Sequence, residues 1–106
     1  MEKHYLIMKW NYDYNKENTW FDEDSGLEQY ELIKGAKYPL PHINRKHIEI
    51  LSVELKEDSL KAEIYVDYNT YILSNKGGSV VGYAHDDYSV AGDTVSQTLC
   101  MYFTIK

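Results

Sequence analysis

The chain has 106 residues, the size of one domain, and we expect a single soluble domain spanning residues 1–106. Seventeen acidic residues against eleven basic ones give a net charge of −6, which repels phosphate backbones and argues against direct nucleic-acid binding. No stretch approaches the roughly 20 apolar residues of a membrane helix, and no export signal is evident. The single cysteine, Cys100, excludes an intrachain disulfide, so the expected location is cytoplasmic.

The first predicted strand runs from His4 to Tyr14. Its alternating apolar or aromatic positions are Leu6, Met8, Trp10, Tyr12 and Tyr14. Such a period of two is typical of a half-buried strand, so these side chains are predicted to face the core. Residues 15–25 are polar and acidic and are predicted to form a loop.

Residues 26–34 are compatible with both a helix and a strand. The spacing of Ser25 and Glu28 matches a capping box, which favours a short helix. Tyr30 and Leu32 also alternate, and this alternation favours a strand instead. Both interpretations stay open, with the helix as the first expectation.

The chain from residue 38 onward is predicted to be extended and then to form antiparallel sheet. A phase slip between Ile50 and Leu51 indicates a β-bulge. Strands are expected at residues 48–55, 62–73, 79–84 and 95–105, with turns at 57–59 and 75–78 and a polar loop at 85–93. Within the second of these strands, Tyr68 is predicted to share the inward face of Val66.

The predicted fold is therefore mainly β, within a β-rich α+β class. Strand follows strand without intervening helices, which indicates an antiparallel meander sheet or a small sandwich or half-barrel, with one or two short helices at most. Met101 and Phe103, in phase on the last strand, are predicted to be core residues.

The best catalytic candidate is the triplet of His85, Asp86 and Asp87. A histidine beside carboxylates can act as a general base near neutral pH. No nucleophile elbow, phosphate-binding glycine loop or Cys-His signature accompanies it, so we expect no catalysis and no cofactor.

No metal site is predicted. Counted from Asp22, the acidic loop places Gly26 at position 5 and Ile33 at position 12, which fails the EF-hand pattern. His42 and His47 lack a nearby third ligand of the kind that zinc sites use.

Acidic and aromatic residues are interleaved in the first third of the chain. Acidic side chains steer a basic partner and aromatic side chains anchor it, so this segment is the predicted partner-binding surface. The predicted contact residues are Asp13, Glu17, Trp20, Phe21, Asp22, Glu23, Asp24, Glu28 and Glu31.

Three functions are compatible with these features. The first is a non-catalytic acidic inhibitor of a basic protein, comparable to an immunity protein or antitoxin that neutralises a nuclease or a nucleic-acid-binding protein. The second is a small-ligand-binding protein or small enzyme on a curved sheet that uses His85, Asp86 and Asp87. The third is a structural or assembly subunit, and the sequence leaves the oligomeric state open.

Overall fold

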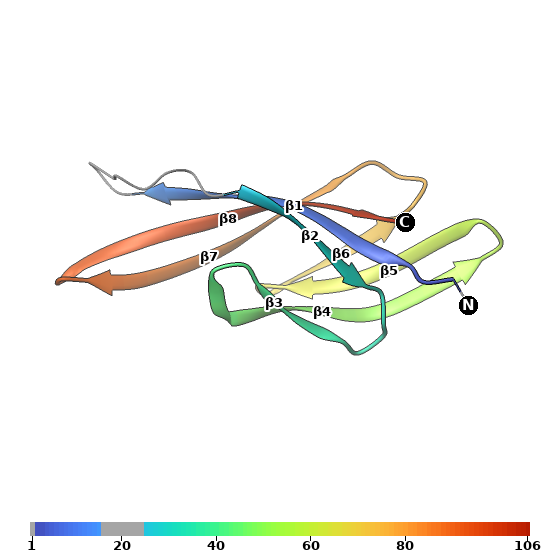
Figure 1. The fold of residues 1–106 in the computed structure, drawn as a ribbon, viewed down its shortest axis with the longest axis horizontal. Coiled ribbons are helices and arrows are strands. Elements are labelled where there is room, and N and C mark those ends of the chain that lie inside the picture. The colour runs from blue at the N-terminus through green and yellow to red at the C-terminus, as the bar shows by residue number, and fades with distance from the viewer. Residues whose placement is uncertain (1, 16–24) are drawn as a thin grey trace.

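The computed structural model describes residues 2–15 and 25–106, which form two antiparallel sheets of four strands and contain no helix (Figure 1). The strands are β1 (Tyr5–Asn15), β2 (Ser25–Glu31), β3 (Lys37–Leu40), β4 (Ile43–Lys56), β5 (Ser59–Val66), β6 (Asn69–Ser74), β7 (Val80–Val90) and β8 (Asp93–Ile105). The prediction of a mainly β fold is confirmed. None of the described residues belongs to a helix with the length and apolar character needed to span a membrane.

The two sheets differ in how the chain connects their strands. One, the meander sheet, has the order β3-β4-β5-β6 and follows the chain, as predicted. The other, the terminal sheet, has the order β2-β1-β8-β7, so that β1 and β8 are neighbours. Their pairing runs from Leu6 opposite Ile105 to Asn15 opposite Ser96. This long-range pairing places the first and last strands at the centre of one sheet.

One hydrophobic core joins the two sheets. The alternating residues of β1 up to Tyr12 are buried, as predicted, and so are Met101 and Phe103 of β8. The meander sheet contributes its own alternating residues, including Ile48 and Ile64, which are fully buried. The predicted bulge is confirmed by a shift in the β4–β5 register between Ile50 and Ser52.

The helix expected at residues 26–34 is wrong, because β2 covers this segment up to Glu31 and pairs with β1. The main-chain groups along this side of β1 need hydrogen-bond partners, and a neighbouring strand supplies them. Gly26 lies directly against the indole of Trp10, where an added Cβ would be only 2.6–2.9 Å from ring atoms. Tertiary pairing with β1 therefore overrides the local capping signal.

The loop expected at residues 85–93 is also wrong. β7 continues to Val90 and turns back through Ala91 and Gly92, whose φ angles of 52° and 87° suit a two-residue hairpin turn. Polar residues remain in strand geometry here because they pair with β8 over the full length of the hairpin, which extends past the end of the meander sheet (Figure 1).

The inward position predicted for Tyr68 is wrong. β5 ends at Val66, and Asp67 and Tyr68 form the turn to β6 with φ angles of 46° and 70°. This turn reverses the chain, so Tyr68 leaves the alternation of β5 and is 86% exposed. The strand expected over residues 62–73 is consequently two strands.

Shortening Phe103 to Ala should lower the free energy of unfolding by about 3–5 kcal/mol, because its ring is fully buried and packs against Tyr71. Urea unfolding followed by circular dichroism measures this loss. Thr104→Ala, one residue away on the exposed face, is the control and should change stability by less than about 0.5 kcal/mol. A loss below about 1 kcal/mol for Phe103→Ala would show that this ring is not a core element.

Candidate functional site

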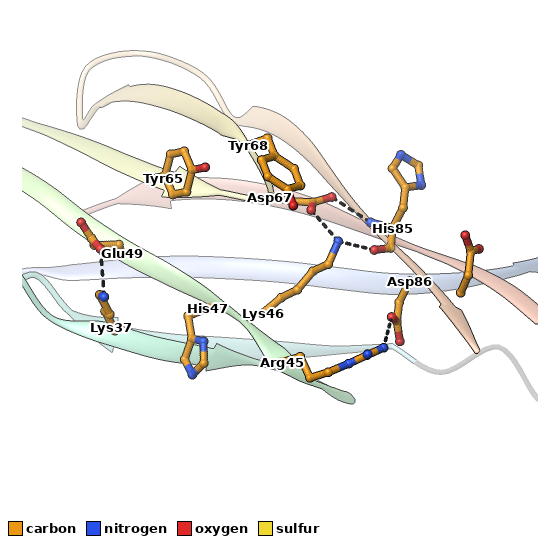
Figure 2. Close-up of a pocket in the computed structure, with 11 residues that line it drawn as sticks. Lys37, Arg45, Lys46, His47, Glu49, Tyr65, Asp67, Tyr68, His85 and Asp86 are labelled. Atoms are coloured by element: carbon orange, nitrogen blue, oxygen red, sulfur yellow. Dashed lines mark hydrogen bonds and ion pairs between the residues drawn. The ribbon is translucent and has the colours of Figure 1, made fainter. Parts of the chain in front are cut away.

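A cavity of about 560 Å³ lies where the end of the meander sheet meets β7 (Figure 2). One wall comes from β3, β4, β5 and the turn after β5, and the other comes from β7. Its lining residues are Lys37, Arg45, Lys46, His47, Glu49, Tyr65, Asp67, Tyr68, His85, Asp86 and Asp87. The cavity therefore contains all three members of the predicted catalytic triplet.

Lys46 connects the two walls of the cavity. Its Nζ donates hydrogen bonds to Oδ1 of Asp67, at 2.5 Å, and to the main-chain carbonyl of His85. The other carboxylate oxygen of Asp67 accepts a hydrogen bond from the main-chain amide of His85, at 3.0 Å. We call this arrangement of Lys46, Asp67 and the His85 main chain the clamp. It fixes β7 of the terminal sheet to the meander sheet.

The clamp is partly buried and holds a turn with an unfavourable backbone. The side chains of Lys46 and Asp67 are only 27% and 8% exposed. Asp67 and Tyr68 both have positive φ angles, a region where non-glycine residues cost of order 1 kcal/mol or more each. Asn69 adds a hydrogen bond from its side-chain amide to the Asp67 carbonyl, at 3.2 Å. These contacts keep the exposed ring of Tyr68 at the cavity.

The clamp changes the acidity of Asp67. Burial is the largest influence and by itself raises the pKa of this carboxyl group. The hydrogen bonds from Lys46 and from the His85 amide, together with the charges of both residues, outweigh burial and hold the pKa of Asp67 below its ordinary value. Asp67 is therefore a carboxylate at neutral pH and serves as an ion-pair partner.

A second connection between the walls uses Asp86. Its Oδ1 lies 3.0 Å from Nη2 of Arg45, and its Oδ2 accepts a hydrogen bond from Nε2 of Gln97 at 3.1 Å. Gln97 is the buried polar residue in the inward phase of β8. Both oxygens of Asp86 are thus engaged, and the carboxylate anchors the polar end of the core.

The triplet of His85, Asp86 and Asp87 does not form a hydrogen-bonded unit. Successive residues of a strand face opposite sides, and Figure 2 shows the imidazole of His85 directed away from the Asp86 carboxylate. Nδ1 of His85 lies 3.1 Å from Oγ1 of Thr98 instead. Asp87 is exposed, and no other described residue forms an ion pair with it.

Most of the predicted partner-binding residues lie outside the described residues: Glu17, Trp20, Phe21, Asp22, Glu23 and Asp24. Asp13 is in β1, opposite Thr98. Glu28 accepts a hydrogen bond from the indole of Trp10 at 3.4 Å, and Glu31 lies 3.4 Å from the ammonium group of Lys3. These last two carboxylates therefore have partners within the chain.

Sequence reasoning missed the residues that build the cavity wall, Arg45, Lys46 and Asp67. Lys46 had a detectable signal, because it continues the inward phase of Ile48 and Ile50 with a charged side chain. A charge in that phase needs a buried partner, but the identity of the partner follows only from the folded structure.

No metal centre is evident in the described part of the chain, which contains no cluster of three or more histidine, cysteine or acidic side chains placed to hold an ion. The ring of His42 packs edge-on against Trp10 and Tyr12, with centroids 5.6 and 5.5 Å away.

Comparison with known proteins finds no family model, curated protein or solved structure that matches the chain.

Replacing Lys46 with Met should lower the free energy of unfolding by about 2–3 kcal/mol, because the Asp67 carboxylate then stays buried without its counter-charge. Urea unfolding at pH 7 measures the loss. The double variant with Asp67→Asn should recover part of it, since the unpaired charge is then gone. If the single variant is as stable as wild type, the clamp does not hold the sheets together.

Asp67→Asn tests the pH dependence of the same interaction, and Asn tolerates the positive φ of this turn as Asp does. The pKa of Asp67 is lower in the folded protein than in the unfolded chain. The ionised carboxylate therefore stabilises the folded state fully above the unfolded pKa of about 3.9, and this stabilisation is lost as the pH falls through the pKa of the folded state. The stability difference between wild type and variant should therefore shrink below about pH 4. A difference that is the same at pH 7 and at about pH 2 would contradict this assignment.

Proposed function

We propose that this chain is a non-catalytic binding protein for a basic protein partner, acting as an immunity protein or antitoxin does when it neutralises a nuclease or a nucleic-acid-binding protein. The proposed docking surface is the end of the terminal sheet where β1, β7 and β8 lie side by side, together with the acidic segment that follows β1. We call this region the acidic end.

The observation that carries the proposal is the register of these three strands. Asn15, the last residue of β1, is opposite Ser96 of β8, and Ser96 is opposite Asp87 of β7. The acidic segment of residues 16–24, with four carboxylates and one lysine, thus leaves β1 at the level of Asp87. Asp87 and the residue from which the acidic segment starts, Asn15, therefore lie at the same end of the terminal sheet.

The distribution of basic residues supports the same surface. Three of them are paired with carboxylates at the cavity: Lys37 with Glu49 at 3.5 Å, Arg45 with Asp86 and Lys46 with Asp67. The segment of residues 80–105, which contains β7 and β8, has three aspartates and no lysine or arginine. Negative charge on this hairpin is therefore only partly compensated by the described residues, and a basic partner would complete the compensation.

A second candidate function is small-ligand binding in the cavity, and the observation that favours it is the cavity itself, with Tyr65 and Tyr68 exposed at its lining. A small ligand seated there would contact the clamp and raise the melting temperature of the purified protein. Tyr68→Ala, a change at an exposed turn residue, should abolish such a shift without affecting binding of a basic protein at the acidic end.

Changing Asp22, Glu23 and Asp24 together to Lys should slow association with the partner, because these carboxylates steer a basic protein toward the surface. The salt dependence of the association rate should also weaken. Salt screens such steering, since the Debye length falls from about 10 Å at 0.1 M salt to about 3 Å at 1 M. Partners captured from the source cell by wild-type protein are first purified. Association and dissociation rates are then measured with the two pure proteins by surface plasmon resonance at both salt concentrations.

The matched control changes Glu57, Asp58 and Glu63 to Lys, which alters the net charge equally on the exposed surface of the β4–β5 hairpin. It should leave the specific site intact and retain most of the association rate. Trp20→Ala should instead speed dissociation, with a loss of about 2 kcal/mol if the ring anchors the complex. An acidic partner, or equal effects of the two charge reversals, would contradict the proposed docking surface.

A further inference from the structure

The main chain of β7 has a free edge whose direction is set by the clamp. Both the amide and the carbonyl of His85 bond to side chains of the meander sheet, so both point away from β8. In an antiparallel pair, the amide and carbonyl of one residue point to the same side, and the side alternates along the strand. Residues at odd positions of β7 therefore turn these groups to the free edge.

The hairpin turn gives the same alternation independently. Val90 and Asp93 close the two-residue turn, and such a closing pair exchanges hydrogen bonds across the hairpin. Counting back from Val90, the even residues bond to β8, while Asp87 and Ser89 have their amides and carbonyls on the free edge. This stretch lies beyond the clamp, next to the cavity.

β7 is the outermost strand of the terminal sheet, and within residues 2–15 and 25–106 no strand pairs with its free edge. At His85 the clamp occupies the edge, so an incoming strand cannot pair there. Beyond His85, the main-chain donors and acceptors of two residues have no strand partner in the described part of the chain, an arrangement that accepts an added strand.

We propose that residues 87–89 of β7 bind an extended basic segment of the partner as an added β-strand. The occupant is basic because the side chain of Asp87 is exposed and forms no ion pair with a described residue, whereas each cation of the adjacent cavity is already paired with a carboxylate. These cations are Lys37, Arg45 and Lys46. A lysine or arginine opposite Asp87 would form a favourable cross-strand pair. This inference rests on the proposed function and specifies how the acidic end holds its partner.

The test uses a synthetic probe, an acetylated and amidated peptide of four Lys-Thr repeats, labelled for fluorescence anisotropy. Threonine favours strands and lysine supplies the charge. The control peptide has the same sequence with every backbone amide between its residues N-methylated, which removes the main-chain donors of both edges but keeps the charge. Wild-type protein should bind the control about tenfold or more weakly than the probe, because several main-chain hydrogen bonds are lost.

Substitutions at two positions, Ser89 and Asp87, locate the site on the protein. Ser89→Pro removes one free-edge amide, which an edge strand tolerates, and should weaken probe binding about fivefold, whereas Ser89→Ala should not. Asp87→Asn should weaken binding and reduce its salt dependence without changing the preference for the unmethylated peptide. Circular dichroism verifies that each variant folds. If Ser89→Pro does not fold, the comparison of methylated and unmethylated peptides on wild-type protein still tests strand addition.

The outcomes separate this inference from the proposed function. Equal binding of methylated and unmethylated peptides, or full binding by folded Ser89→Pro, would overturn strand addition. Strand addition can fail while changing Asp22, Glu23 and Asp24 to Lys still slows association with a basic partner. The proposed function then stands without strand addition. Preference for an acidic Glu-Thr peptide of the same length would overturn the basic occupant.

Discussion

The ion pair between Lys46 and Asp67 lies beside the hydrophobic core that the two sheets share. Toward the interior, β4 continues with Ile48 and β5 with Val66, both fully buried. Beside this core, inward positions of β4 and β8 carry polar side chains. Lys46 pairs with Asp67 within the meander sheet, and Gln97 donates a hydrogen bond to Asp86 within the terminal sheet. A lysine and a carboxylate this little exposed are tolerated because each has a partner and a further hydrogen bond to the main chain of β7.

This one contact determines three properties of the region around it. It fixes β7 relative to the meander sheet, which forms the cavity between them. It holds the turn with two positive φ angles that keeps Tyr68 exposed. It also occupies the edge of β7 at His85, so that the free edge begins only at Asp87. The cavity and the free edge of β7 are therefore both bordered by the clamp.

The fold was largely predictable from period-two patterns, because burial of one face determines alternation directly. The errors occurred where another interaction overrode the local pattern. Pairing with β1 made a strand of residues 25–31, and pairing with β8 kept polar residues of β7 in a strand. The candidate site was less predictable, since Lys46 and Asp67 are 21 positions apart in the sequence and Lys46 and His85 are 39 apart. Only the three-dimensional arrangement of the sheets brings them together.

The pairing of β1 with β8 has a consequence for how the protein folds. During synthesis, β3 to β6 can form the meander sheet from contacts between neighbours in the chain, but β1 has to wait for β8 before its second edge is paired. Until β8 pairs, the apolar face of β1 is only partly covered. Bringing β1 and β8 together is slow, because they are separated by most of the chain. We therefore expect folding to be limited by this last closure, and chaperone dependence or aggregation to arise mainly in chains whose final strand has not yet been made.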